Sequence, residues 1–500
     1  MNRIEILPEP VLNFRYGQAM IDPRDGLSIF GPYDTDFPSH PSNIVYGIIG
    51  GKQGLEKFAR FTHLITSPVL TDMSKYDYKN WPHFPGFEAA YHSQFPDAPS
   101  FVHELNEKTL LDEAKDYDAH KRATRLVEMY LEGFTIAAKR DENIGTMFCV
   151  VPDIVWKNCR PLSVVEQGTG HKVSPKERRH RRAGKDLFGG YDPEDYKRSV
   201  DFRRQLKARA MEYGIPIQIV KESTLELRGG TDTGTVRESP RSAVAWFFST
   251  AVYYKNGGKP WRLGTARDGV CYIGIVFRKS EIMSDSDKTA CCAAQMFLDS
   301  GDGVVFKGEF GPWYSPETKE FHLSKDMACQ ILKGVLETYR ELHGKQIREI
   351  FLHSRSPINM EEYQGYSEAC PDDVNLVAIR VRRDQDGLRL FRPGNRPVFR
   401  GTFLPVSENR CYLWATGFKP RLETYDGFDV PVPLSIDIQH GRADLKQTAY
   451  DILGLTKLNY NTCRLGESQP VTVGFSNKVG EILISNPTIS SCKPQFKFYI

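Results

Sequence analysis

VDFRRQLKARAMEYGIPIQIV, residues 200–220, contains the pattern that decides the fold of the first half of the chain. Residues 200–213 are predicted to be helical, and Gly214 ends the helix where a left-handed cap requires no Cβ atom. IPIQIV then forms a strand. A helix followed at once by a strand is the building unit of α/β folds, so this segment favours that class.

The same alternation extends upstream and downstream of this segment. Helices are predicted over 54–67, 119–139 and 242–255, where SAVAWFFSTAVYYK is closed by Gly257 and Gly258. TMFCVV at 146–151 is predicted to be a short buried strand that stops at Pro152. Alternating helices and strands over 54–255 therefore predict a Rossmann-like three-layer domain.

The pattern changes after residue 259, where strands come first and helices later. Strands are predicted over 270–277, 303–310, 348–353, 374–381, 411–418 and 470–475, and helices over 326–343 and 443–455. This order is typical of an RNase H-like α/β layout, although composition alone does not separate it from other α/β folds. The Pro-rich first 50 residues predict an extended arm. We therefore expect an arm over 1–50, a first domain over 51–258 and a second over 259–500.

Composition excludes several protein classes. Hydrophobic residues make up 40% and charged residues 26% of the 500 residues, which is a globular balance and excludes a disordered chain. The start MNRIEILPEP has no signal pattern and no apolar run could span a bilayer, so a cytoplasmic protein without membrane contact is expected. The ten cysteines form no CxxC, which argues against a zinc ribbon. The net charge of +3 is too small to indicate a nucleic-acid partner.

Generic catalytic motifs are also missing from the sequence. There is no Walker A, GxSxG or HExxH motif. LRGGTDTGT at 227–235 is Gly-rich without GxGxxG and is predicted to be a loop. HKVSPKERRHRRAGK at 171–185 holds seven Lys or Arg residues against one acid. This segment is either a solvated loop or an insertion that faces phosphates; its candidate contacts are Arg178, Arg179, Arg181 and Arg182.

Phosphate recognition is the stronger theme in the first domain. Arg203 and Lys207 are four residues apart and share one helix face, Gln218 lies on the next strand, and Lys255 ends the next helix. Arg offers a fork of donors, Lys a point charge and Gln a neutral donor, which together suit a terminal phosphate. Spacing alone leaves the alternative of ordinary surface cations open.

Long blocks of the sequence resemble the short prokaryotic Argonautes, which contain only a MID and a PIWI domain. The blocks include IPIQIVKESTL, STAVYYKNGGKPWRLG, GVCYIGIVF, CCAAQMFLDSGDGVVFKGEFGPWY and LTKLNYNTCRLGESQPVTVGFSNKVGEIL. The resemblance implies a Rossmann-like MID domain followed by an RNase H-like PIWI domain. It places Arg203, Lys207, Gln218 and Lys255 in the pocket for the guide 5′-phosphate. It also implies a Mg²⁺ ion between the guide phosphates and the C-terminal carboxylate of Ile500.

The resemblance fails at the residues that cut nucleic acid in slicing Argonautes. Two metal ions there are held by four acidic or His side chains. This chain has Val276 in place of the first Asp, Ser354 near the third position, the Asp of an RDG turn, and Asn461 near the fourth. We therefore expect a PIWI domain that binds a duplex without cutting it. The alternative is an active nuclease that uses displaced acids, with Asp299, Asp302 and Glu309 nearby in sequence.

The blocks look closest to the branch whose partner protein joins a TIR domain to an APAZ region. Relatives of this kind use a guide RNA to find complementary single-stranded DNA from a plasmid or phage, and the heterodimer then assembles into a higher oligomer. The partner hydrolyses NAD(P), and the infected cell dies or stops growing. A Sir2-APAZ or nuclease-APAZ partner is the alternative, and an α/β protein without nucleic acid is another.

Overall fold

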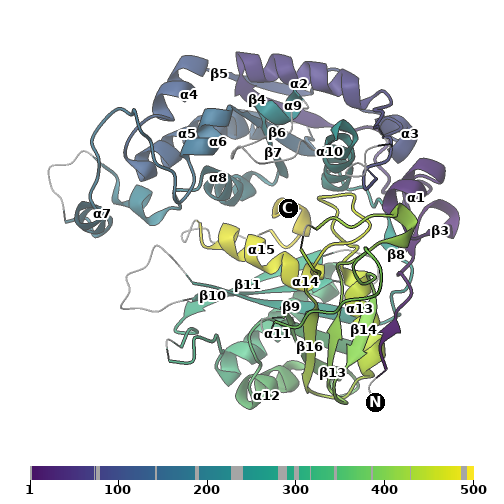
Figure 1. The fold of residues 1–500 in the computed structure, drawn as a ribbon. Coiled ribbons are helices and arrows are strands. Elements are labelled where there is room, and N and C mark those ends of the chain that lie inside the picture. The colour runs from purple at the N-terminus through teal and green to yellow at the C-terminus, as the bar shows by residue number, and fades with distance from the viewer. Residues whose placement is uncertain are drawn as a thin grey trace.

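The computed structural model describes residues 3–500 apart from residues 73, 75–78, 141–142, 186–190, 227–239, 280–289, 298–302, 316, 343–345, 385–386, 428 and 486–492. The chain forms two α/β lobes, one above the other, with the C-terminus between them (Figure 1). Each lobe is built around one large sheet, so the predicted α/β class is confirmed.

The first lobe has a parallel sheet of order β5-β4-β6-β7. Its strands are β4 (Tyr46–Gly51), β5 (Phe101–Leu105), β6 (Thr146–Val151) and β7 (Ile217–Lys221). Its helices are α2 (Lys52–Ile65), α3 (Phe87–Tyr91), α4 (Glu107–Glu113), α5 (Ala119–Ala138), α6 (Asp153–Asn158), α7 (Pro175–Arg182), α8 (Phe202–Ala210), α9 (Glu222–Leu225) and α10 (Arg241–Lys255). Every residue of β4 and β6 is buried, as expected for a parallel sheet that helices cover on both faces.

The segment that decided the fold behaves as its sequence predicts. The side chain of Asp201 caps α8 by accepting a hydrogen bond from the main-chain N–H of Arg204. The helix tightens into a 3₁₀ turn at Met211–Tyr213 and ends at Gly214, which has a φ of 69°. This left-handed conformation turns the chain straight into β7. As a result, α8 and β7 lie next to each other at the base of the first lobe (Figure 1).

The second lobe has a mixed sheet of order β1-β14-β15-β16-β13-β12-β9-β10-β11. Its later strands are β9 (Val270–Lys279), β10 (Ala290–Phe297), β11 (Gly303–Gly311), β12 (Glu349–Ser354), β13 (Asn375–Arg383), β14 (Thr402–Pro405), β15 (Arg410–Leu413) and β16 (Leu434–His440). The central strands β13, β12 and β9 are parallel to one another. Their neighbours on both sides are antiparallel.

Helices cover both faces of this sheet. One face packs against α11 (Lys325–Leu342), followed in the chain by α12 (Met360–Ala369). The other face packs against α13 (Leu445–Leu455), α14 (Val471–Gly474) and α15 (Ser476–Leu483). In Figure 1, α14 and α15 lie between the sheet and the first lobe.

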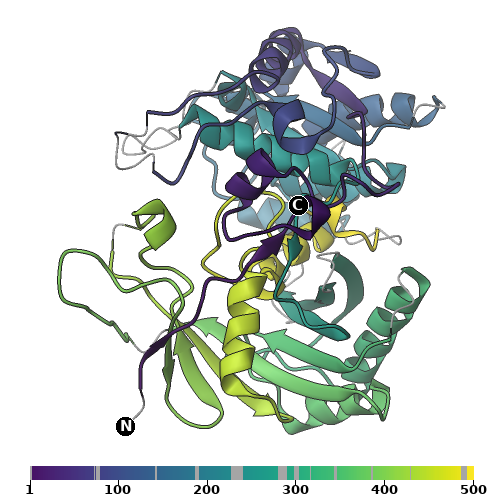
Figure 2. The ribbon, with the colours of Figure 1, turned by 90° about the vertical axis from the view of Figure 1, so that its right-hand side faces the viewer.

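The N-terminal segment is docked on the second lobe rather than standing free. Strand β1 (Glu5–Ile6) pairs with β14, and the segment then forms a small sheet of β2 (Leu12–Asn13), β3 (Ala19–Met20) and β8 (Arg262–Leu263) before α1 (Pro23–Ile29). Figure 2 shows it, in dark purple, running up along the second lobe towards the first. Glu9 forms ion pairs with Arg400 and Lys457. Strand β4 starts at Tyr46, so the first lobe begins before residue 51.

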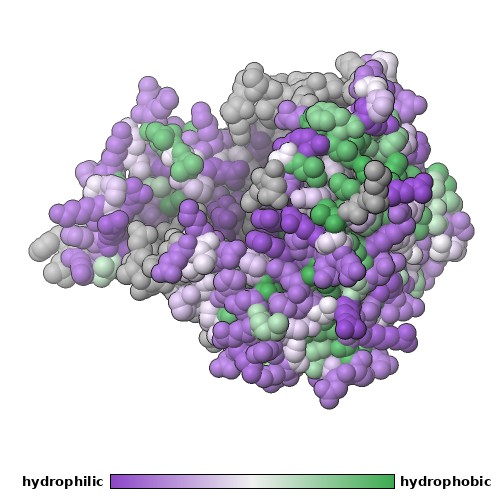
Figure 3. Space-filling model, turned by 60° about the horizontal axis from the view of Figure 1, so that its bottom comes forward, coloured by the Kyte–Doolittle hydropathy of each residue, from purple (hydrophilic) through white to green (hydrophobic). Residues whose placement is uncertain are grey.

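One predicted element is wrong. PVTVGF was expected to be a strand, but Val471–Gly474 form helix α14. The main-chain oxygen of Thr472 would lie 2.0 Å from a Cβ atom at Gly274, so only glycine lets α14 approach β9 this closely. Among the helices that the structure describes, none is long and apolar enough to cross a membrane. The face of the molecule in Figure 3 is mostly hydrophilic.

Candidate functional site

The structure brings the four predicted phosphate ligands together. Arg203 and Lys207 lie one turn apart on α8, Gln218 lies on β7, and Lys255 is the last residue of α10. The ammonium group of Lys255 donates hydrogen bonds to the main-chain oxygen of Ile217, at 2.9 Å, and to the amide oxygen of Gln218. Both Lys207 and Lys255 are buried. The site therefore concentrates cations at the base of the first lobe.

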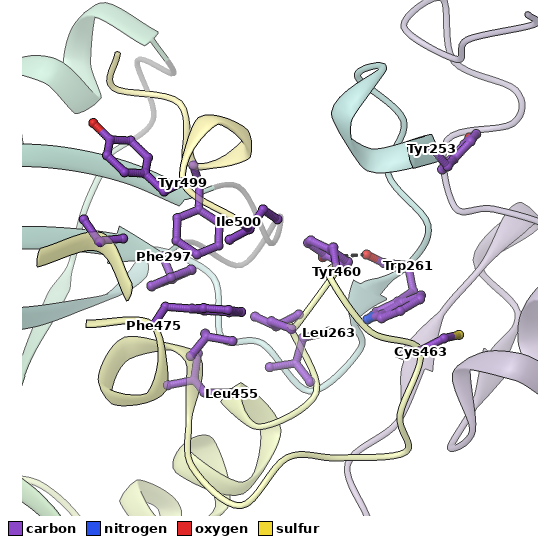
Figure 4. Close-up of a cluster of buried hydrophobic side chains, with 14 of the residues drawn as sticks. Tyr253, Trp261, Leu263, Phe297, Leu455, Tyr460, Cys463, Phe475, Tyr499 and Ile500 are labelled. Atoms are coloured by element: carbon purple, nitrogen blue, oxygen red, sulfur yellow. Dashed lines mark hydrogen bonds between the residues drawn. The ribbon is translucent and has the colours of Figure 1, made fainter. Parts of the chain in front are cut away.

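The last residue of the sequence enters this site from the second lobe. Lys207 donates a hydrogen bond to the main-chain oxygen of Ile500 at 2.6 Å. The tail is held by a hydrogen bond from the Val305 main-chain N–H to Pro494 and by ring contacts of Phe496 with Phe297 and Phe475. Figure 4 shows Ile500 beside this cluster of aromatic side chains. The site therefore lies at the junction of the two lobes.

Crowded positive charge dominates the electrostatics of the site. Burial, and then the nearby Arg203, lower the pKa of Lys255 from 10.5 to about 7. Burial lowers the pKa of Lys207 well below its ordinary value, and the charged side chains that add to this effect are the cations Lys255, Arg203 and Lys478. Buried cations require an opposite charge. An anion with several negative charges is the ligand that this arrangement fits.

Two lysines of the second lobe join the cluster and were not predicted from the sequence. Lys478 lies on α15, and burial followed by the charge of Arg203 lowers its pKa. Lys497 donates a hydrogen bond to the main-chain oxygen of Lys255 at 3.4 Å, and burial lowers its pKa. No spacing in the sequence relates these residues to α8 or α10. Only the packing of one lobe on the other brings them together.

The oxygen atoms of the site fit a divalent cation only together with an anion. Ile500 and Gln218 offer oxygen atoms, and each already accepts a hydrogen bond from an ammonium group. Mg²⁺ in proteins is usually bound through one or two carboxylates plus phosphate oxygens and water. Here the surrounding cations would repel the ion unless phosphates entered with it. The site therefore fits Mg²⁺ that arrives with a phosphate ligand.

The structure places the degenerate catalytic positions Val276 and Ser354 on opposite faces of the sheet. The parallel register places Ser354 beside Ile275, and both face the α11 side of the sheet. Val276 points to the other face, where it belongs to the same core cluster as Phe351 and Val479. Strand β12 ends at Ser354, and continuing its register by one residue past that end would bring Arg355 to the level of Val276. Ser354 is therefore not the partner of Val276.

Asn461 is not brought to this place by any described contact. Its main-chain N–H donates to the Asn459 side chain, which in turn donates to Glu467. Thr472 of α14 lies there instead, and its hydroxyl shares a hydrogen bond of 2.9 Å with Nδ1 of His353. Burial lowers the pKa of His353 to about 3, so this imidazole is neutral. It is a core histidine.

Among the described residues, no group of three or more His, Cys, Asp or Glu side chains is arranged to hold a metal ion. The displaced acids Asp299 and Asp302, the side chain of Glu309 and the Gly-rich segment 227–235 lie outside the part of the chain that is described.

The basic segment 171–185 contains helix α7, and its four arginines have two different roles. The helix begins with a capping box formed by Ser174 and Glu177. Arg181 forms ion pairs with Asp118 and Glu177, and Arg182 donates to the main-chain oxygen of Tyr196 at 3.0 Å. Arg178 and Arg179 are exposed. The inner pair therefore anchors the helix, and the outer pair faces solvent.

Comparisons with known proteins give a clear answer for the fold. No protein-family model matches the chain. No curated protein matches its sequence. The whole chain superimposes on Clostridium butyricum Argonaute bound to a guide DNA and a 19-mer target DNA, with a TM-score of 0.60, 15% identity and coverage of 55% of that protein.

Two further structures give the same result. Aa-Ago with externally bound siRNA matches with a TM-score of 0.56 at 12% identity, over 100% of this chain and 56% of that one. A. aeolicus Argonaute matches with a TM-score of 0.53 at 12% identity, over 99% and 54%. This chain thus spans a little over half the length of the Argonautes it matches. At these identities the likeness concerns the fold: the chain has the mixed α/β fold of the MID and PIWI domains of Argonaute proteins.

Proposed function

We propose that this protein binds the 5′-phosphate of a guide RNA and uses the guide to recognise complementary single-stranded DNA. The observation that carries the proposal is the buried cationic cluster at the lobe junction, where several cationic side chains surround Lys207 and Lys255 and only the terminal oxygen of Ile500 is described as an opposing group. A terminal phosphate supplies up to two negative charges and three acceptor oxygens. It would compensate charges that the protein itself leaves crowded.

The roles of the residues follow from their chemistry. Lys207 and Lys255 act as point charges, Arg203 offers a fork of donors, and the Gln218 side chain contributes its amide group. The terminal oxygens of Ile500 would help to hold a Mg²⁺ ion that arrives with the guide, and the ion would neutralise part of the phosphate charge. Lys207, which donates to Ile500, lies close enough to take part in binding the phosphate.

We further propose that the protein holds the guide–target duplex without cutting it. Two-metal cleavage needs several carboxylates around the reacting phosphate. Val276 is buried in the apolar core at the first of these positions, and Arg355 follows the end of the neighbouring strand β12. The guanidinium of Arg355 would repel metal ions, and the alkyl side chain of Val276 offers them no ligand atom. These positions therefore support binding of the duplex rather than its hydrolysis.

The protein is proposed to act through a partner, which the sequence resemblance suggests is a TIR-APAZ protein. In this scheme the two chains form a heterodimer in the cytoplasm. The paired guide and target favour a higher oligomer, because that state binds the duplex more tightly. The partner then consumes NAD(P), and the infected cell is lost together with the plasmid or phage.

One assay tests the function as a whole. The protein is combined with 5′-phosphorylated guide RNA, Mg²⁺ and its partner, and both NAD⁺ and the DNA are measured in the same tube. NAD⁺ loss that requires complementary DNA, with the DNA intact, is the expected result; non-complementary DNA is the control. DNA cleavage by this chain without the partner would establish an active nuclease instead. DNA degradation without NAD⁺ loss, seen only with the partner, would indicate a nuclease partner.

A further inference from the structure

The carboxyl ends of three parallel strands carry a concentration of guanidinium groups. Strands β13, β12 and β9 run in the same direction and end at one edge of the sheet. Arg355 follows the end of β12, and Arg380 and Arg383 lie near the end of β13. Ligands of open α/β sheets bind outside the carboxyl ends of parallel strands. This edge therefore has the location of a binding site and the charge to hold an anion.

Arg355 and Arg383 are the exposed members of this group, and the described contacts of Arg355 involve no acid. Its Nη2 donates to the amide oxygen of Gln469 at 2.6 Å, which is a neutral partner. The main-chain oxygen of Arg355 accepts a hydrogen bond from Nε of Arg380 at 3.1 Å, which brings a second cation to the same place. Arg380 has an acid within reach, since Glu320 lies 3.7 Å away. The charge of Arg355 is thus exposed to solvent, with no acid among its described contacts, and can meet an external ligand.

The partner of Arg355 lies in the wall of a cavity of about 660 Å³. The cations of this wall are Arg383, Arg389, Lys419 and Arg464, and its acids are Asp426, Asp429 and Glu467. Two of the acids are already engaged: Asp426 pairs with Lys419, and Glu467 accepts from Asn459 and Thr462. Outside the Lys419–Asp426 ion pair the wall has three arginines and two acids, so it keeps a small excess of positive charge.

We propose that Arg355 binds a backbone phosphate of the target DNA strand at the position where a nuclease of this fold would hold its metal ions. The proposal rests on the proposed function, since it presupposes a bound guide and target. The planar guanidinium matches two phosphate oxygens at once. Unlike a metal ion it cannot generate a hydroxide nucleophile, so it holds the phosphodiester without cleaving it.

Replacing single phosphates of the target tests this contact directly. Methylphosphonate, which is neutral, is introduced at one position at a time in the DNA, and target affinity is measured with the guide already bound. Wild-type protein should lose about tenfold to hundredfold in affinity at one position or two adjacent ones, as expected for one charged hydrogen-bonded contact. The Arg355→Ala variant should bind the unmodified DNA about tenfold to hundredfold more weakly than wild type. A methylphosphonate at the same position should then cause no further loss of affinity.

Matched variants separate this contact from general charge. Arg60→Ala removes an exposed cation from α2, on the far side of the first lobe (Figure 1), and should change neither target affinity nor the position profile. Arg355→Lys keeps the charge without the fork and should recover part of the affinity. An Arg355→Ala protein that shows the wild-type position profile would overturn the proposal. The proposal would also be overturned if the loss of affinity depended on Arg355 only when the methylphosphonate was placed in the guide strand instead of the target. Neither result would affect guide binding, whereas failure to bind a phosphorylated guide would remove the proposed function itself.

Discussion

The ammonium group of Lys207 and the main-chain oxygen of Ile500 lie 2.6 Å apart, although 293 residues separate them in the sequence. Lys207 belongs to the first lobe and Ile500 to the second, and both are almost fully buried. A ligand that draws Lys207 towards itself must therefore change the contact between the lobes.

Lys207→Ala should weaken binding of a 5′-phosphorylated guide by about one to two orders of magnitude, because a hydrogen bond between charged groups contributes roughly 1.5–3 kcal/mol. A guide with a 5′-hydroxyl should lose little on the same substitution. Filter binding of both guides measures the difference. The matched control is Lys52→Ala, which removes an exposed lysine at the start of α2. Equal losses for the two guides would show that Lys207 contacts the strand away from its 5′ end.

Adding residues after Ile500 should lower guide affinity and remove its dependence on Mg²⁺. The extension turns the terminal carboxylate into an amide, and it must find space at a position where Ile500 is only 2% exposed. A neutral amide oxygen is a weaker ligand for a hard divalent cation than a carboxylate. Titration of guide affinity with Mg²⁺ measures the effect, with the same residues added at the N-terminus as control. An unchanged Mg²⁺ response would contradict the assignment of Ile500 as a ligand.

Guide affinity should fall as the pH rises above 7. Lys255 has its pKa lowered to about 7 in the ligand-free protein, and an incoming phosphate needs the charged form, so binding takes up a proton. If binding takes up one proton, the affinity falls by up to about tenfold for each unit by which the pH rises above 7. Arg203, Lys207 and Lys478 face the same space, and Lys255→Arg, which stays charged, should flatten the profile. An affinity that stays constant from pH 7 to 9 would contradict this linkage.

The stability of the ligand-free protein should show the opposite trend. The unfolded chain keeps Lys255 charged up to about its ordinary pKa of 10.5, whereas the folded protein releases the proton near pH 7. Below pH 7 the buried Lys255 amine is charged in the folded protein, and the free energy of unfolding is reduced by the full cost of burying that charge. This reduction disappears progressively as the pH rises towards 10.5. Thermal unfolding of wild type and Lys255→Met over this range measures it. The wild-type midpoint should rise relative to that of the variant.

The elements that sequence predicts well are those whose local signals agree. Helix α8, its end at Gly214 and strand β7 follow from spacing and one glycine. Strand β10 could not be found in this way, because its Ala, Cys, Gln and Met residues do not favour strands. Pairing with β9 and β11 on both sides determines its conformation. The strand prediction for PVTVGF was wrong for the converse reason. Its β-branched residues favour a strand, but they form helix α14 where Thr472 packs against β9.

The residues of the candidate site that could be predicted are those of the first lobe and, through the resemblance, Ile500 of the second. The residues from α8, β7 and α10 follow one another in sequence, and the resemblance gave them their roles. Lys478 and Lys497 come from the second lobe, and only lobe packing reveals them. The sequence also does not show which face of the sheet Ser354 occupies. The register of β12 on β9 shows that it pairs with Ile275 and lies on the opposite face from Val276.

The two arginine pairs of α7 should respond differently to substitution. Arg178 and Arg179 are exposed, whereas Arg181 and Arg182 hold the helix to Asp118 and Tyr196. Replacing the exposed pair with Ala should reduce the slope of log K against log salt by roughly 1.4–1.8 if both meet phosphates of the bound strands, and should leave thermal stability unchanged. Replacing the inner pair should lower stability by about 1–3 kcal/mol, because the buried carboxylate of Asp118 loses a charged partner.

Salt titration of target binding and thermal unfolding distinguish the two pairs in the same preparations. The balance of charge is the same in both double variants, so net charge cannot explain a difference between them. A wild-type salt slope in the exposed-pair variant would show that α7 is a solvated helix without contact to nucleic acid. A stable inner-pair variant would show that the anchor at Asp118 does not hold the helix in place.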